Sequence, residues 1–356
     1  MDNRLKNLPD SIWQKIALID EFKGRWVGGA QLNLQALSRL KQFVLVTSTG
    51  ASTRIEGSRL SDKEVEKLMK GLAIQRFSDR DKQEVQGYYK LLANVFNSWE
   101  DLHFSESLIK HFHSELLKYV DKDQLHRGEY KKQKNKVVMI DKTGQSIGVL
   151  FDTAPAYLTP KAMQELIEWT KKSFQNKNHH PLLIIGGFLV QFLQIHPFQD
   201  GNGRLSRILT NLLMLRAGYG YMPYVSHEKL IEDNKPDYYL ALRRSQKTFK
   251  TNQATIISWL EFFLEIVFKQ VKLATVLLSA ENVEKLLSPA QLKTWKYLQQ
   301  AAEATPKELS EKLNIPRPTV NQILSKLIKL KKIERLGQGR STRYRKFQGL
   351  SKETCC

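Results

Sequence analysis

The feature that most constrains the fold of this 356-residue sequence is an apolar run from Pro181 to Ile195, which is followed by His196 and Pro197. A helix that is apolar on all sides belongs inside a helical core rather than on its surface. The helix is expected to stop at His196, because Pro197 has no N–H to donate and disfavours helical geometry in the residue before it. A glycine-rich turn and a second helix, from about Gly203 to Arg216, follow. The sequence thus predicts two core helices joined by a tight polar loop.

Most of the remaining chain also predicts helices, with one β-hairpin before the core helices. The runs Val137–Ile140 and Ile147–Phe151 are separated by a turn at Asp141–Gly144, which is typical of a hairpin. Nearer the N-terminus, Thr49–Ala51 is predicted as a turn, and a capping box at Ser61 opens a helix. The expected fold is mainly α.

The C-terminal part predicts three short helices and then a second hairpin. Capping boxes begin at Ser288 and Thr305, each with proline at the first helical position. A third helix follows Pro316, with apolar residues on one face at Val320, Ile323, Leu324 and Leu327. A turn around Gly337 would then join two strands. This order is that of a winged helix-turn-helix, which we place at residues 288–348.

Residues 196–207 combine groups suited to a nucleotide within twelve positions, reading His-Pro-Phe-Gln-Asp-Gly-Asn-Gly-Arg-Leu-Ser-Arg. Glycines at 201 and 203 leave backbone N–H groups open at a helix N-terminus, which favours phosphate. Arg204 and Arg207 project from one side of that helix and could clamp a polyphosphate. Asp200 offers a hard oxygen ligand for Mg²⁺, and His196 could accept a proton from an attacking hydroxyl.

Other interpretations of this loop fit less well. An isolated Asp-Gly-Asn-Gly is usually a plain turn. An EF-hand would need a glutamate at its twelfth position, where counting from Asp200 finds Asn211. The lysine of a P-loop is also absent from this segment. The complete set of residue types is what favours a phosphate-binding catalytic loop.

The loop resembles the Fic signature, His-Pro-Phe-x-Asp/Glu-Gly-Asn-Gly-Arg-x-x-Arg, at every specified position. The likeness extends from about residue 90 to 265. It implies a protein adenylyltransferase that moves AMP from ATP to a Ser, Thr or Tyr hydroxyl of a target protein or of itself. In that reading His196 is the general base and Asp200 holds Mg²⁺ between the α- and β-phosphates. Phosphate oxygens would be bound by Gly201, Asn202, Gly203, Arg204 and Arg207.

The resemblance also implies roles for two other segments. In Fic enzymes the hairpin is a flap that docks the target's backbone by strand addition, which corresponds here to Ile147, Gly148, Val149, Leu150 and Phe151. Tyr239 and Gln246 fall where relatives place groups near the nucleoside.

A built-in inhibitor is expected in Ser52–Gly57, which resembles the family's Ser/Thr-x-x-x-Glu-Asn/Gly motif. Alone, this short pattern would more often be a capped helix with a solvated glutamate. Together with the Fic loop it predicts that Glu56 pairs with Arg207 and takes the place of the γ-phosphate. Its position before the core corresponds to the class with an N-terminal inhibitory helix.

The formal net charge of +20 favours acidic partners, although a solvated lysine-rich surface would give the same total. From residue 317 to 346 ten basic residues stand against the single acid Glu334. Such clustering over residues 305–346 predicts double-stranded DNA as a partner, with Thr319, Asn321 and Gln322 near base edges and Arg340 and Arg343 on the wing. A winged helix that binds protein remains the alternative.

Several classes of protein are disfavoured by composition. No apolar run approaches the length of a membrane span, and the two cysteines, Cys355 and Cys356, are adjacent and cannot staple a fold. A reducing cytoplasm is the expected compartment. A homodimer is left open.

The predicted organisation has five parts. They are an N-terminal helical region with the inhibitory motif at 52–57 (1–90), the Fic core (91–265), a helical connector (266–287), the winged helix (288–348) and a tail (349–356). The alternatives to an adenylyltransferase are a DNA-binding regulator whose Fic core senses ATP, and a Fic enzyme that transfers another phosphate-linked group or removes AMP.

Overall fold

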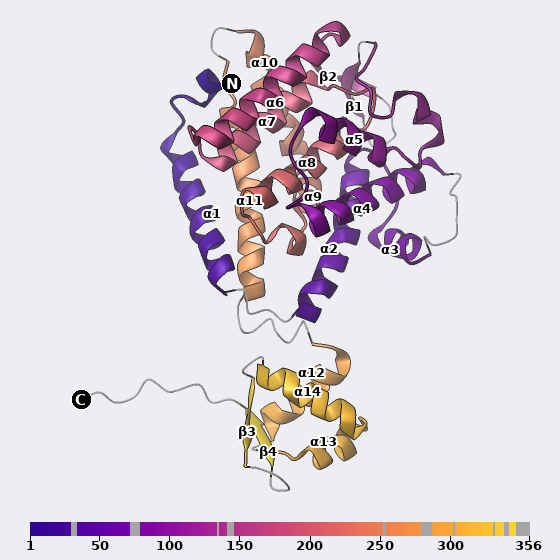
Figure 1. Ribbon diagram of the computed structural model, residues 1–356, viewed down its shortest axis with the longest axis vertical. Helices are drawn as coiled ribbons and strands as arrows, with labels where there is room; N and C mark the ends of the chain where they lie inside the picture. The colour runs from indigo at the N-terminus through magenta and orange to yellow at the C-terminus, as the bar shows by residue number, and fades with distance from the viewer. Residues whose placement is uncertain are drawn as a thin grey trace, which may run out of the picture. The chain divides into compact units, whose positions relative to one another are not determined.

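The computed structural model describes residues 1–29, 34–71, 79–133, 135–140, 146–251, 254–278, 287–301, 303–329, 332–337 and 342–346. The chain forms two compact units (Figure 1). The first comprises residues 1–30 and 38–275, and the second comprises residues 31–37 and 276–356. Within the described residues, no helix is both long and apolar enough to cross a lipid bilayer.

The first unit is a helical bundle with one hairpin. Its helices are α1 (Asp10–Gly29), α2 (Leu34–Ile55), α3 (Asp62–Lys70), α4 (Arg80–Ser98), α5 (Glu106–Leu116), α6 (Thr159–Asn176), α7 (Pro181–Ile195), α8 (Asn202–Arg216), α9 (His227–Asp233), α10 (Lys235–Lys247) and α11 (Ile257–Leu278). Short 3₁₀ helices lie at Asp2–Leu5, Asp121–His126, Ala156–Leu158, Met222–Tyr224 and Thr248–Lys250.

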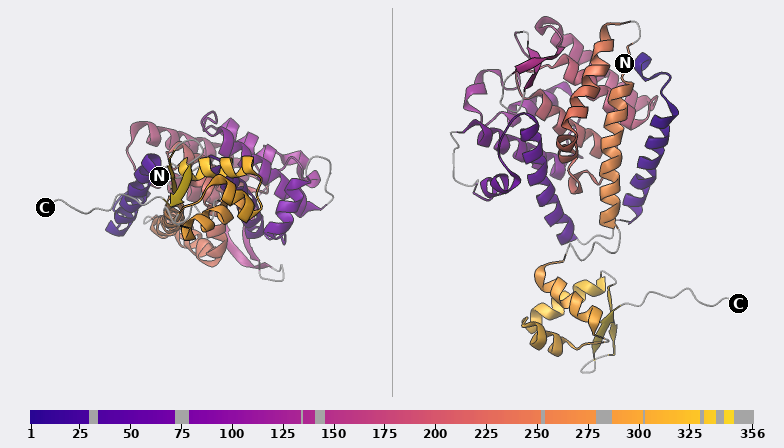
Figure 2. Two further views of the ribbon diagram at one scale, coloured as in Figure 1. Left: turned by 90° about the horizontal axis from the view of Figure 1, so that it is seen from below. Right: turned by 180° about the vertical axis from the view of Figure 1, so that it is seen from behind.

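The two central helices are those that the sequence predicted. All residues of α7 except Pro181, Gln191 and Gln194 are buried, and α7 packs between α6 and α8. Outside them, α1 and α11 run side by side in Figure 1 and in the right view of Figure 2. An ion pair of 2.5 Å between Lys15 Nζ and Glu265 Oε2 joins these two outer helices. The sides of α7 are therefore covered, as its composition requires.

The predicted hairpin is confirmed by strands β1 (Lys136–Ile140) and β2 (Ser146–Asp152), which pair antiparallel. The register joins Lys136 to Asp152 and is irregular between Val137 and Val138 and between Met139 and Ile140. The predicted turn at 141–144 lies outside the described residues. The hairpin thus precedes α6, and α6 and α7 separate it in sequence from the polar loop.

The turn predicted at Thr49–Ala51 is wrong, because α2 continues through it to Ile55. The threonine hydroxyls do not break the helix, since Thr49 Oγ1 donates to Leu45 O and Thr53 Oγ1 to Thr49 O. Gly50 is used for close approach instead. A Cβ there would lie 2.5 Å from Asp62 Oδ1 and 2.6 Å from Arg54 Nη1, so the missing side chain makes room for an ion pair against the helix.

The second unit has the order of a winged helix. Its elements are α12 (Pro289–Gln300), α13 (Pro306–Leu313), α14 (Arg317–Lys329), β3 (Ile333–Leu336) and β4 (Arg343–Lys346). Both predicted capping boxes, at Ser288 and Thr305, are formed. The predicted apolar face of α14 is buried in a small core with Trp295 and Leu298. The strands pair antiparallel, and Tyr344 also bridges Ala304 just before α13.

Close packing of α4 against the end of α5 leads to a first prediction. A Cβ on Gly87 would stand 2.0 Å from the carbonyl oxygen of Leu116, which is backbone and cannot rotate away. We therefore expect Gly87→Ala to lower the thermal unfolding midpoint, with an overpacking cost of about 1–3 kcal/mol. The matched control is Gly24→Ala in α1, where nothing lies within 4 Å, so the midpoint should hold or rise slightly. An unchanged midpoint for Gly87→Ala would contradict the close packing.

Candidate active site

The predicted polar loop connects the C-terminus of α7 to the N-terminus of α8. His196 and Gly201 both adopt left-handed backbone angles, with φ of 52° and 76°. The side chain of Asn202, the first residue of α8, closes the loop, because its Oδ1 accepts from Phe198 N at 2.9 Å and its Nδ2 donates to Phe198 O at 2.8 Å. In this structure the Asn202 amide therefore shapes the loop, and its predicted phosphate contact stays a prediction.

His196 is held as a neutral base. Its Nδ1 lies 3.3 Å from the carbonyl oxygen of Leu193, which can only accept a hydrogen bond. Nδ1 therefore carries the hydrogen, and Nε2 has a lone pair that can accept a proton. Burial lowers the pKa of His196 to about 4. The imidazole is consequently unprotonated near neutral pH, as a general base must be.

Asp200 lies between two guanidinium groups. Its Oδ2 is 2.9 Å from Arg204 Nη2 and 2.8 Å from Arg80 Nη2, and Arg204 also pairs with Glu84 at 2.8 Å. Burial of the carboxyl would raise its pKa, but Arg204, the Gly201 N–H and Arg80 outweigh this effect and lower the pKa of Asp200. The side chain is thus an ionised carboxylate near neutral pH. Arg80 could not be predicted as part of this site, because it lies 120 residues away in the chain, on α4.

Arg207 is almost completely buried and is bound by the end of α2. Its Nε donates to Ser52 Oγ at 2.7 Å, and its Nη2 donates to Ser52 O at 2.9 Å and to Glu56 Oε1 at 2.7 Å. The remaining nitrogen, Nη1, is buried and has no hydrogen-bond partner among the residues that the structure describes. A Cβ added to Gly203 would collide with Glu56 Oε1. The Glu56 carboxylate therefore lies directly over the first turn of α8, as predicted from the two motifs.

The end of α2 is fixed by Arg54, which precedes Glu56 by two residues. Its guanidinium pairs with Glu232 on α9 at 2.6 Å and with Asp62 on α3 at 2.9 Å. It also donates to Leu60 O at 2.9 Å. These contacts place the last turn of α2 over α8.

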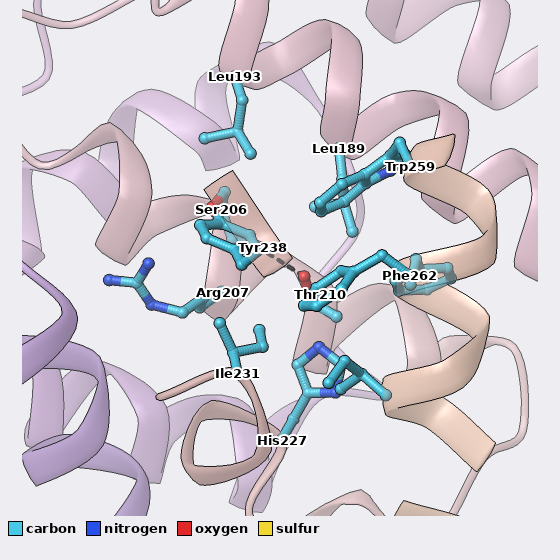
Figure 3. A pocket seen from close by; sticks show the side chains of 12 residues that line it. Leu189, Leu193, Ser206, Arg207, Thr210, His227, Ile231, Tyr238, Trp259 and Phe262 are labelled. Atoms are coloured by element: carbon cyan, nitrogen blue, oxygen red, sulfur yellow. Dashed lines mark hydrogen bonds between the residues drawn. The ribbon is translucent and has the colours of Figure 1, made fainter. Parts of the chain in front are cut away.

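A small cavity lies beside Arg207 and is lined by side chains of α7, α8, α9, α10 and α11, most of them apolar or aromatic (Figure 3). Its volume is about 10 Å³, which is room for about one water. Figure 3 shows the Arg207 guanidinium pointing away from this apolar lining. The cavity is too small for a nucleotide. The guanidinium is bonded to Ser52 and Glu56 instead.

His113 on α5, which was not predicted from the sequence, contacts the loop at Phe198 and Asp200. Its ring stacks on Phe198 with centroids 3.9 Å apart. Nδ1 accepts from Gly128 N at 2.9 Å, so Nε2 carries the hydrogen and donates to Asp200 O at 3.0 Å. Burial lowers the pKa of His113 to about 4. Only tertiary structure reveals this role, since a lone histidine on a helix has no distinctive pattern.

The remaining predicted residues lie at different depths. Tyr239 Oη is 3.5 Å from Ile55 O, beside the end of α2. Gln246 is buried and donates to Val190 O on α7 at 3.3 Å. Their nucleoside contacts stay predictions. The backbone of 147–151 forms β2, but the side chains there lie outside the described part of the structure, as does Arg340.

The buried histidines give a second prediction. The folded pKa of His113 is below the value of about 6.5 expected in the unfolded chain, so between these values the unfolded state binds more protons. Stability should therefore fall as pH is lowered from about 6.5 towards 4. We expect a lower melting midpoint for His113→Gln at pH 7.5 but a smaller further decrease on acidification. An identical decrease in both proteins would contradict the assignment.

Two family profiles match the chain. A profile of the Fic/DOC family matches residues 103–214, and one described as winged helix-turn-helix DNA-binding matches residues 288–334. The protein adenylyltransferase Fic of Drosophila mojavensis is 44% identical over 57 residues, which cover 16% of this chain and 11% of that protein. A probable protein adenylyltransferase of Aquifex aeolicus is 31% identical over 84 residues, covering 24% and 25%. The chain thus matches a quarter or less of these relatives' length.

Solved structures agree in fold. A Fic family protein from Desulfovibrio desulfuricans is 23% identical, with 98% of each chain covered and a TM-score of 0.63. A Fic domain containing signaling protein from Bacteroides thetaiotaomicron is 22% identical, covers 72% of this chain and 95% of its own, and has a TM-score of 0.58. The chain therefore combines a Fic domain with a C-terminal winged helix-turn-helix.

Proposed function

We propose that the chain is a protein adenylyltransferase that transfers AMP from ATP to a Ser, Thr or Tyr hydroxyl of a protein target or of itself. The observation that carries this proposal is the neutral His196 at the end of α7, next to the N-terminus of α8 with Arg204 and Arg207. A base and a cationic phosphate site on one short loop are what such a transfer requires.

The reaction follows from these positions. The acceptor hydroxyl attacks the α-phosphorus of ATP while its proton passes to His196 Nε2. The bond from the α-phosphorus to the bridging oxygen breaks, and pyrophosphate leaves with the electron pair. Arg204 and Arg207, together with the N–H groups at the start of α8, would stabilise the charge on the β- and γ-phosphates. Catalysis would come mainly from positioning and from electrostatic stabilisation.

The residues present fit Mg²⁺ as a companion of ATP. Asp200 is ionised and is a hard oxygen ligand. Among the described residues, no group of three His, Cys, Asp or Glu side chains could hold a metal alone. A cation at Asp200 would thus complete its shell with phosphate oxygens and water, where it would neutralise phosphate charge.

Autoinhibition by Glu56 is part of the proposal. The carboxylate bonds to Arg207 Nη2 and covers Gly203, which is the space that the end of the triphosphate would need. ATP could then bind only in a pose that keeps its α-phosphorus away from the acceptor. The side chain of Glu56 is 34% exposed, so water can reach this pair and its strength is lower than that of a fully buried one.

The hairpin is proposed to hold the target. It is a two-stranded sheet in which β2 has one edge without a partner strand among the described residues. An extended segment of a target could add to that edge by main-chain hydrogen bonds and present its hydroxyl to His196.

Two alternative reactions and one non-catalytic role are also compatible with a Fic domain. Transfer of another phosphate-linked group, or removal of AMP with Glu56 positioning a water, would use the same loop. An ATP sensor without catalysis would not need the neutral base at His196. The position of a radioactive label separates these cases, because AMP transfer carries the α-phosphate and phosphorylation carries the γ-phosphate.

DNA binding by the second unit is the second proposed function, favoured by the match to a DNA-binding winged helix. Asn321 and Gln322 are exposed at the start of α14, where a recognition helix reads bases. Two wing arginines are paired in this structure, Arg345 with Glu334 at 2.7 Å and Arg343 with Glu303 at 3.4 Å. Phosphate binding would have to replace those acids.

The third prediction tests the enzyme and its inhibitor. Glu56→Gly should increase self-modification by α-labelled ATP at least about tenfold, because Arg207 is freed for phosphate. Adding His196→Ala should abolish the label, since no base remains. Intact mass would identify the transferred group. Glu66→Gly, at an exposed glutamate of α3, is the control and should behave as wild type. Equal labelling of wild type and Glu56→Gly would dispose of the inhibitory role.

The fourth prediction concerns DNA. A duplex should be retarded in a gel at low salt, and the affinity should fall by at least about tenfold between 50 and 200 mM salt. Asn321→Ala with Gln322→Ala should weaken sequence preference, whereas Gln300→Ala on α12 should not. Failure to retard any duplex at low salt would count against DNA as the partner.

A further inference from the structure

Lys131 is a buried lysine between the 3₁₀ helix at Asp121–His126 and strand β1, and it has no part in the steps above. The residue is 4% exposed. Its ammonium donates to Ile195 O at 2.9 Å, to Asn135 Oδ1 at 2.9 Å and to Thr153 Oγ1 at 3.0 Å. Its own N–H donates to Pro197 O at 2.8 Å. Lys131 therefore binds the carbonyl groups of the residues before and after His196, one through its side chain and the other through its backbone N–H.

The ammonium is unusual because all of these partners are neutral oxygens. Among the described residues no carboxylate forms an ion pair with it, and burial lowers its pKa to about 8. Burying a charge without a counter-charge has a large free-energy penalty. Stability of the fold alone therefore does not explain a lysine at this position, and its hydrogen bonds indicate another role. An exposed surface lysine would show none of these contacts.

The partners of Lys131 identify that purpose. Asn135 immediately precedes β1, and Thr153 immediately follows β2, so they are the two ends of the hairpin. Thr153 Oγ1 is also within 2.7 Å of Asn135 Oδ1 and 2.8 Å of Asn135 O. Asn135 Nδ2 donates to Phe198 O at 2.8 Å, beyond His196 on the loop. The hairpin ends and the loop thus share one hydrogen-bond network with Lys131 at its centre.

We propose that Lys131 is a positioning residue that fixes the base of the β1–β2 hairpin to the loop carrying His196. This inference rests on the proposed function for its catalytic meaning. If the hairpin holds the acceptor and the loop holds the base, the distance between acceptor hydroxyl and imidazole is set where these two segments join. Lys131 does not touch the phosphate site at Arg207 and Gly203, so it acts on the reaction rate and not on ATP affinity.

The test uses Lys131→Met and Lys131→Arg in the Glu56→Gly protein, with Lys132→Met as the control. Lys132 is the exposed neighbour, so its replacement removes the same charge from the surface. We expect Lys131→Met to slow self-modification by about 100-fold, as expected for a misplaced base. Calorimetric affinity for Mg²⁺-ATP should stay within about twofold, and Lys131→Arg, which keeps charge and donors, should recover most of the rate.

A second readout does not depend on activity. Hydrogen exchange of wild type and Lys131→Met, without nucleotide, should show faster exchange in both strands and in residues 195–198, but not in α11. Thr153→Val, which removes the bridging hydroxyl with little change in volume, should give the same pattern more weakly. This variant keeps the test available if Lys131→Met fails to fold.

Three results would overturn the inference. They are a rate for Lys131→Met equal to that of Lys132→Met, a loss of ATP affinity that parallels the loss of rate, and unchanged exchange at the hairpin ends in Thr153→Val. If the Glu56→Gly parent does not label itself at all, the proposed function fails, while the exchange experiment still decides whether Lys131 couples the two segments.

Discussion

The first unit depends on a guanidinium that is buried before any nucleotide arrives. Arg207 projects from the second turn of α8, and its side chain is only 2% exposed. A buried cation needs an anion or several acceptors, and α2 supplies both through Ser52 and Glu56. The need of the buried Arg207 for an anion therefore accounts both for the position of the end of α2 and for the proposed autoinhibition.

The loop beside this cation is rigid because its polar groups are satisfied from several directions. Asn202 closes it from within, His113 holds Asp200 from α5, and Lys131 holds the carbonyl groups on either side of His196. Left-handed backbone at a non-glycine residue such as His196 is strained and persists only where such contacts fix it. Preorganisation of this kind is what a site that works by positioning requires.

The sequence predicted the parts of this protein that local rules determine. The apolar run of α7, the proline after His196 and the capping boxes at Ser288 and Thr305 act over a few residues, and the structure confirms the elements that they mark. The Glu56–Arg207 contact was predictable only because two short motifs were read together.

Where prediction failed or was silent, tertiary contacts were decisive. Gly50 suggested a turn, but there the glycine makes room for the Arg54–Asp62 pair inside a continuous helix. Arg80, His113 and Lys131 have no motif, and each reaches the loop from a segment between 64 and 120 residues away. No periodicity or spacing encodes contacts across such separations, because they depend on how the helices pack.

The missing side chain of Gly203 has a consequence for which substitutions this chain can tolerate. The same few cubic ångströms accommodate the Glu56 carboxylate at rest and, in the proposed reaction, the end of the triphosphate. Any larger residue at 203 would displace the Glu56 carboxylate and, in the proposed reaction, the triphosphate as well. Substitution of Gly203 is therefore expected to remove both at once, whereas a change in the segment that carries Glu56 can alter the proposed inhibition and leave the phosphate-binding loop intact.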